Sequence, residues 1–116
     1  MSSLRYGDVV EIKLNRGTEN QKSPHRYGVI ISADAINDNL KTVIVCPLID
    51  AKEVKESRVG VTFIPNHIIG VERDSLAFSL QIKTISKDRI VKRINSVPRN
   101  YMGQIKKSLY AVLDLA

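Results

Sequence analysis

One polar segment, running from Gly17 to Arg26, brings a carboxylate, an imidazole and a guanidinium close together in the chain. These groups belong to Glu19, His25 and Arg26. Carboxylates and imidazoles can move protons, and the planar guanidinium binds phosphate groups and stabilises negative charge. The chain has no GxxxxGK[ST], GxGxxG or GxSxG motif, and two histidines with one cysteine give no zinc-site spacing. We therefore expect metal-free acid–base chemistry without a cofactor.

RNA cleavage would suit this set of side chains. The ribose 2′-hydroxyl is an internal nucleophile, so a protein need only remove its proton, protonate the leaving oxygen and stabilise the charged phosphorane. We predict that Arg26 stabilises the transition state and that Glu19 or His25 moves protons. Each residue also has a structural alternative. Arg26 could form a salt bridge, Glu19 could be a solvated loop charge, and His25 could pack on the neighbouring surface.

Two predicted strands flank this segment and would fix both of its ends. Residues 8–14 alternate, with Val10, Ile12 and Leu14 on one face, and residues 27–32 are nearly all apolar, as in a strand buried on both sides. Hairpin loops usually have about two to five residues. Because this connection is longer, it is either functional or merely unconstrained, and loops held between strands often carry binding and catalysis.

The middle of the chain predicts further strands. Residues 33–39 are typical of a turn or a single helical turn, and residues 42–49 are the strongest strand pattern. Pro47 predicts a bulge or a sheet edge at the far end of that strand. Residues 59–64 alternate. Residues 74–85 predict one or two strands, with one face formed by Leu76, Phe78, Leu80 and Ile82.

The C-terminal segment has helical periodicity from about Val97 onward, with Ser96 as a plausible N-cap and Pro98 in the first turn. The apolar positions are Tyr101, Met102, Ile105, Leu109, Val112 and Leu113. We therefore predict one domain over residues 1–116, mainly β with α. Its fold would be a small SH3-like antiparallel barrel of five to seven strands with a C-terminal helix.

Net charge is +6, and the positive charge is concentrated in residues 82–107. This segment has eight Lys and Arg residues and only one acidic residue, Asp88. This block suggests an anionic partner, although a solvated surface is the simpler reading. Cys46, alone in an apolar run, is expected to be a small core residue in a reducing compartment. The N-terminus has no apolar signal segment and no run is long enough to span a membrane, so we expect a cytoplasmic protein without membrane contact.

The order of several segments resembles the MazF/PemK (Kid) family of toxin endoribonucleases over about residues 5–115. The matching segments are residues 6–10, 17–19, Arg26 with 29–32, 42–47, 74–77 through 81–85, 89–90 and 102–115. The resemblance implies a PemK/CcdB-type barrel that forms a homodimer and cuts single-stranded RNA without metal. It also implies inhibition by a cognate antitoxin, normally small and acidic.

The resemblance also implies roles for individual residues. Arg26 falls on the catalytic arginine of the family, and Glu19 matches a glutamate that lines the active site in some members. Thr18 and Gln81 occupy RNA-facing or supporting positions. We also predict that Lys22, Asp50 and Lys83 bind RNA.

Three positions depart from the family pattern. Ile49 stands where many members have a threonine or serine, and it cannot move a proton, although Asp50 could substitute if the strand bulges at Pro47. Leu80 replaces an acidic residue before Gln81, and Tyr27 replaces a proline. The chain could therefore be slow, use His25 for the missing groups, or be inactive.

Two other functions stay open. A catalytically inactive barrel could inhibit DNA gyrase as CcdB toxins do, but the last residues lack the Trp-Gly-Ile ending associated with them. A basic barrel could also bind RNA without cutting it. Against this, most of the six aromatic residues fit core positions, so a base-stacking platform is poorly supported.

Overall fold

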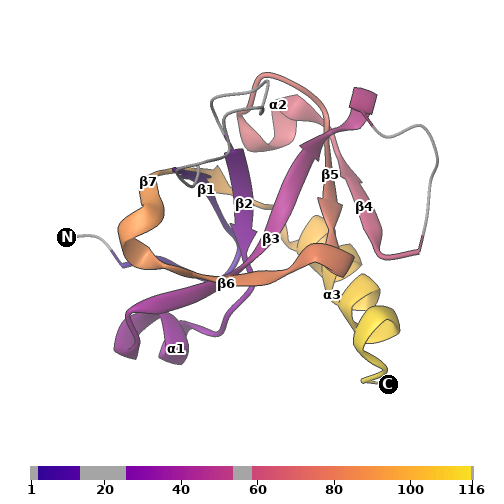
Figure 1. Cartoon of the computed structure of the whole chain (residues 1–116). Coiled ribbons are helices and arrows are strands. Elements are labelled where there is room, and N and C mark those ends of the chain that lie inside the picture. Colours follow the sequence, from indigo (N-terminus) through magenta and orange to yellow (C-terminus); the bar gives the residue numbers. More distant parts are fainter. Residues whose placement is uncertain (1–2, 14–25, 54–58, 116) are drawn as a thin grey trace.

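The computed structural model describes residues 3–13, 26–53 and 59–115 (Figure 1). Within these ranges the strands are β1 (Asp8–Ile12), β2 (Arg26–Ile30), β3 (Thr42–Asp50), β4 (Val61–Ile64), β5 (Ser75–Phe78), β6 (Lys83–Ser86) and β7 (Ile90–Ser96). The helices are α1 (Asp34–Asn39), α2 (Asn66–Ile69) and α3 (Arg99–Leu113). Three single 3₁₀ turns are η1 (Ala51–Glu53), η2 (Ser79–Gln81) and η3 (Lys87–Arg89).

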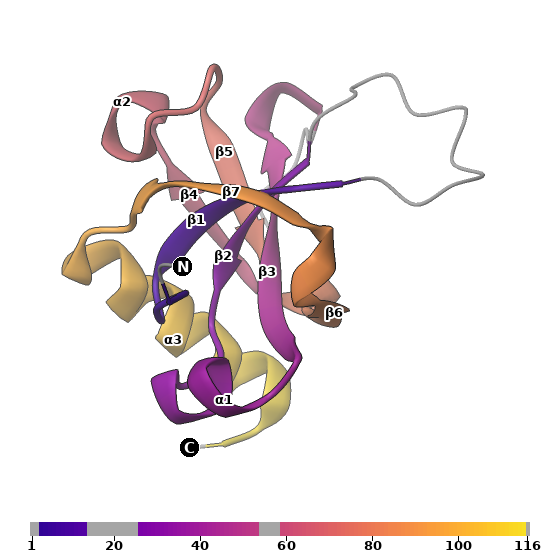
Figure 2. The same ribbon diagram turned by 90° about the vertical axis from the view of Figure 1, so that its left-hand side faces the viewer.

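All strand pairs are antiparallel and belong to one seven-stranded sheet. Its order is β4-β5-β3-β2-β1-β7, and β6 pairs with β3 beside this path. Figure 2 shows how strongly the strands cross one another, with α3 along one side of the sheet. The prediction of a mainly β fold with a C-terminal helix is confirmed. The predicted barrel is not closed, because β4 and β7 end the sheet without pairing with each other in the part of the chain that is described.

Strand β3 organises the sheet because it has three partners. Along one edge it pairs with β2, and along the other edge it pairs first with β6 and then with β5. Pro47 lies where β6 gives way to β5, opposite Gly28 of β2. The Ile31 N–H donates to the Ile44 carbonyl at 2.9 Å, so these two residues form a hydrogen-bonded pair. Such pairs alternate with non-hydrogen-bonded pairs along an antiparallel ladder, so the pair of Gly28 with Pro47 is not hydrogen-bonded. The missing N–H of Pro47 therefore faces the gap between β6 and β5.

The prediction that Pro47 lies at a bulge or at a sheet edge is wrong. The register of β3 with β2 runs from Tyr27 with Leu48 to Ile30 with Val45 without a shift. A proline can occupy this central strand because the partner change leaves no backbone carbonyl waiting for its N–H.

Successive residues of the central strands enter two separate cores. The larger core contains Val9, Val29, Cys46, Leu48, Ile64, Ile69, Ala77, Val97, Met102 and Ile105. The smaller core contains Val10, Ile12, Ile30, Val43, Val45 and Ile85. This arrangement confirms that the segment after Arg26 is buried on both sides and that Cys46 is a core residue. The helical turn predicted within residues 33–39 is also confirmed, as α1.

Several details of the sequence predictions are wrong. Ser96 ends β7 and is not the N-cap of α3, which is Pro98. The predicted apolar face of residues 74–85 does not form, because η2 interrupts the strand and leaves Leu80 60% exposed, while Ala77 is buried on the opposite side. Of the six aromatic side chains, most of which were expected in the core, three are half-buried and three are exposed. Tyr27 and Tyr101, both half-buried, pack against the larger core. Leu14 lies outside the residues described.

None of the helices in the described ranges is long and apolar enough to cross a membrane.

Candidate functional site

Arg26 is the first residue of β2, and its side chain is exposed. It pairs with Ile12 of β1, and the register of β2 with β3 continues to place it beside Ile49. Gly28, on the same face of β2, keeps this part of the sheet thin, because a Cβ there would lie 3.1 Å from Ile12 Cδ1. The sheet therefore presents a guanidinium at its rim, on the side of the smaller core.

Tyr27 lies on the opposite face of β2, where it packs against the larger core. Its hydroxyl donates to Glu72 Oε1 at 3.3 Å, and Glu11 is its paired residue on β1. Burial, followed by the charges of Glu72 and Glu11, raises the pKa of Tyr27 above its ordinary value. The phenol therefore stays protonated and can donate to Glu72 at neutral pH.

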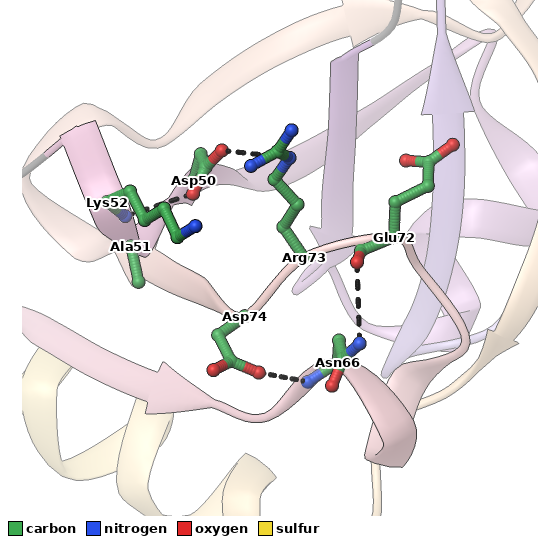
Figure 3. A pocket seen from close by; sticks show the side chains of 7 residues that line it. All are labelled: Asp50, Ala51, Lys52, Asn66, Glu72, Arg73 and Asp74. Carbon is green, nitrogen blue, oxygen red and sulfur yellow. Dashed lines mark hydrogen bonds and ion pairs between the residues drawn. The ribbon is translucent and has the colours of Figure 1, made fainter.

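A pocket of about 480 Å³ opens at the end of β3 (Figure 3). Its lining residues are Asp50, Ala51, Lys52, Asn66, Glu72, Arg73 and Asp74. They come from β3 with η1, from the start of α2, and from the connection between α2 and β5. The pairing of Asp50 with Ser75 brings these segments together.

Hydrogen bonds and one ion pair hold the walls of this pocket. Asp74 Oδ1 accepts the Asn66 backbone N–H at 2.8 Å, and Asp50 Oδ1 accepts the Lys52 backbone N–H at 2.9 Å. Arg73 Nε lies 3.5 Å from Asp50 Oδ2. The backbone bonds orient the carboxylates before any ligand binds.

The structure places only some of the predicted site residues. Thr18, Glu19, Lys22 and His25 lie outside the described ranges, so their roles remain predictions. Arg26 and Asp50 lie at the same end of the sheet, but on opposite faces. Without a bulge at Pro47, the suggestion that Asp50 takes the place of Ile49 beside Arg26 is wrong, since the unshifted pleat turns Asp50 toward the pocket.

Gln81 and Lys83 are both exposed, at the end of η2 and at the start of β6. Lys83 pairs with Val45, five residues before Asp50 in β3. At a rise of about 3.3 Å per residue, this separates the two positions by about 16 Å along the strand. The structure does not bring Gln81 and Lys83 to the pocket.

Sequence reasoning missed the pocket residues Lys52, Asn66, Glu72, Arg73 and Asp74. A signal was present in the run Glu72-Arg73-Asp74, where charges of alternating sign follow Gly70, a left-handed C-cap with φ +72°. Such a charged run after a short helix indicates a surface loop. The sequence does not show that this loop meets the end of β3, because the two segments are distant in the chain.

The basic block of residues 82–107 has two kinds of members. Lys87 donates to the Asn37 carbonyl, Arg89 Nη2 donates to the Lys13 carbonyl at 2.8 Å, and Arg93 Nε donates to buried Asp8 at 2.9 Å. These three cations support the fold. The other members are exposed, namely Lys83, Lys92, Arg99, Lys106 and Lys107.

Cys46 and the acidic residues offer little further chemistry. Burial raises the pKa of the Cys46 thiol to about 12, which leaves it protonated and unreactive in the folded chain. Among the side chains that the structure describes, no three His, Cys, Asp or Glu residues are placed to hold a metal ion.

Known proteins resemble this chain in sequence and in fold. "Endoribonuclease MazF2" of Mycobacterium bovis is 25% identical over 95 residues, which cover 82% of this chain and 83% of the relative. "Endoribonuclease MazF6" of Mycobacterium tuberculosis matches to the same extent. A mycobacterial endoribonuclease solved with its cognate antitoxin has a TM-score of 0.76 at 18% identity, covering 100% of this chain and 98% of that one. MazF from Deinococcus radiodurans has a TM-score of 0.77 at 14% identity, covering 98% and 99%.

The family comparison covers nearly the whole chain. The model of the PemK-like, MazF-like toxins of type II toxin–antitoxin systems matches residues 5–113. This range includes Arg26, the pocket at the end of β3 and helix α3. The sequence-based assignment is thereby confirmed, and the chain belongs to the PemK-like, MazF-like family of toxins of type II toxin–antitoxin systems.

Proposed function

We propose that this protein is a metal-independent endoribonuclease toxin that cleaves single-stranded RNA in the cytoplasm and acts as a homodimer. The observation that carries this proposal is the exposed guanidinium of Arg26 at the rim of the sheet, inside the stretch that matches the toxin family. The relatives named endoribonucleases match the chain over 82% of its length and support the same activity.

Arg26 would bind the scissile phosphate with its planar fork and stabilise the extra charge of the phosphorane. The 2′-hydroxyl of the substrate supplies the nucleophile, so the protein adds only proton transfer. Ile49, beside Arg26, has no proton to give. Glu19 and His25 are therefore the candidates for proton transfer, with Thr18, Lys22, Gln81 and Lys83 as RNA contacts.

We further propose a small acidic antitoxin as the cognate partner. A mycobacterial endoribonuclease of similar fold was solved in complex with its cognate antitoxin, and MazF of Deinococcus radiodurans was solved as MazE-MazF, which supports a partner of this kind. The exposed cations of the basic block would attract both an acidic peptide and RNA by long-range charge.

The test is cleavage of a mixed-sequence RNA by the purified protein in excess EDTA. We expect discrete fragments with 2′,3′-cyclic phosphate and 5′-hydroxyl ends, and no fragments with Arg26→Ala. Circular dichroism should show that the variant folds, because the exposed side chain of Arg26 is not part of either core.

The same assay separates the other functions. RNA that is bound but stays intact would indicate a non-cleaving RNA-binding module. Intact, unbound RNA together with inhibition of purified DNA gyrase would indicate a CcdB-like toxin. Fragments that appear only when Mg²⁺ is added would contradict the metal-independent mechanism.

A further inference from the structure

The pocket at the end of β3 is not needed for the proposed cleavage chemistry, yet it lies at the same end of the sheet as Arg26, on the opposite face. Asp50, on its wall, directly follows Ile49, which the strand register places beside Arg26. Tyr27 directly follows Arg26 and holds Glu72, another lining residue. A ligand that extends from Arg26 around the rim of the sheet, at the ends of β2 and β3, would reach this pocket on the opposite face.

The charges of the pocket argue against a phosphate as its occupant. Three carboxylates, on Asp50, Glu72 and Asp74, stand against two cations, Lys52 and Arg73. A phosphate would meet net repulsion from this set. A neutral group that offers both donors and acceptors, with donors in excess, fits better.

The atoms left open in the pocket have a definite pattern. Asp74 Oδ1 is occupied by the Asn66 backbone N–H, while its second oxygen has no partner among the described residues. Arg73 reaches Asp50 through Nε, and its side chain is 60% exposed. Figure 3 shows Asp50, Lys52 and Arg73 on one side of the pocket and Asp74 with Asn66 on the other. The cations Lys52 and Arg73 therefore lie across the pocket from the Asp74 carboxylate, with the Asp50 carboxylate beside them.

We propose that this pocket binds a guanine base of single-stranded RNA, adjacent to the nucleotide whose phosphate contacts Arg26. Guanine presents N1–H and N2–H₂ as neighbouring donors, which match a carboxylate such as that of Asp74. Its O6 and N7 acceptors match an arginine or lysine, here Arg73 or Lys52. Adenine and cytosine each present only an amino donor, and uracil a single N–H between two carbonyls, so an acceptor-rich pocket favours guanine. This inference rests on the proposed function, because it needs RNA at Arg26.

The experiment measures binding without cleavage, in an Arg26→Ala background. Fluorescence anisotropy would compare a labelled short uridine tract with the same tract carrying one guanosine, one inosine or one adenosine. We expect guanosine to tighten binding about tenfold. Inosine should lose part of this gain because it lacks the N2 amino group, and adenosine should lose most of it.

Asp74→Asn is the decisive variant. It keeps an oxygen for the Asn66 N–H, which preserves the loop, but it replaces a carboxylate oxygen with a donor. We expect the guanosine preference to disappear while affinity for the plain uridine tract stays within twofold of the parent. The matched control is Asp88→Asn, an exposed acidic residue in η3 outside the pocket, which should retain the preference. Thermal unfolding would check that both variants fold.

Equal affinity for all tracts, or a guanosine preference that survives Asp74→Asn, would overturn the proposal. A pocket variant that weakens only the binding of an acidic peptide, and of no RNA, would overturn it in favour of a peptide site. RNA cleavage without any guanosine preference would leave the endoribonuclease function standing and remove this subsite. A guanosine preference in a protein that never cuts RNA would support this subsite and remove the endoribonuclease function.

Discussion

Arg26 and Tyr27 are neighbours in the chain but lie on opposite faces of β2. The first places an exposed cation at the rim of the sheet, beside the smaller core. The second is packed against the larger core and orients a carboxylate through its hydroxyl. The difference shows how two successive residues of a pleated strand can serve two faces, which in our proposals are phosphate chemistry at Arg26 and base recognition beside Tyr27.

The two residues also differ in what supports them. Two residues after Arg26, Gly28 packs closely against Ile12, where a Cβ would lie 3.1 Å from Ile12 Cδ1. Tyr27 depends on burial and on charges contributed by Glu72 and Glu11. Changes at the first site should therefore alter rate, and changes at the second should alter pH dependence.

The largest expected effect follows from Arg26→Lys, which keeps the charge and removes the planar fork. We expect RNA cleavage to slow by about 100-fold or more, equivalent to about 2.7 kcal/mol, with an unchanged unfolding temperature. Single-turnover cleavage and thermal unfolding measure the two quantities. Arg99→Lys, at the exposed start of α3, is the matched control. Cleavage within a few-fold of the wild-type rate would mean that only the charge matters.

A smaller effect is expected from Gly28→Ala, because the new methyl group would crowd Ile12 Cδ1 at 3.1 Å and the Val45 Cβ at 3.4 Å. Overpacking should reduce the free energy of unfolding by about 1–2 kcal/mol in urea denaturation. Adding Ile12→Val removes the crowding atom and should restore part of the loss. Gly103→Ala is the control, since a Cβ there meets nothing within 4 Å and should stabilise α3 by about 0.5–1 kcal/mol. Equal responses at both glycines would contradict the thin-sheet explanation.

The smallest effect concerns the raised pKa of Tyr27. Because the folded chain holds the phenol proton more tightly than the unfolded chain, stability is fully present below the ordinary pKa of 10.0 and is lost as pH rises above it. Tyr27→Phe should therefore lose less stability than the wild type when thermal unfolding is followed from about pH 8 to about pH 11. Glu72→Gln should shift the profile in the same direction by a smaller amount. Parallel profiles for all three proteins would show that Tyr27 does not contribute.

The parts of the fold that could be predicted from sequence are those with local periodicity. The apolar run of β3 and the helical spacing of α3 lie within single segments, and the family resemblance supplied their order. Strand β7 was missed because Lys92 and Arg93 interrupt its apolar residues and only two positions are even half-buried. Its partner β1 lies at the other end of the chain.

The candidate site, like the fold, could be predicted from sequence only in part. Arg26 could be proposed because it opens an apolar strand after a polar segment. The pocket could not, because Asp50, Asn66 and Asp74 meet only through the pairing of β3 with β5. Such a pairing depends on long-range packing that no local pattern records.

The continuous register of β2 also limits how this toxin can evolve. Inserting or deleting one residue within the strand would exchange its two sides, sending the guanidinium toward the larger core and the tyrosine toward the rim. New cleavage specificities should therefore arise by point substitution around the end of β3, while the length of β2 stays constant among descendants that remain toxic.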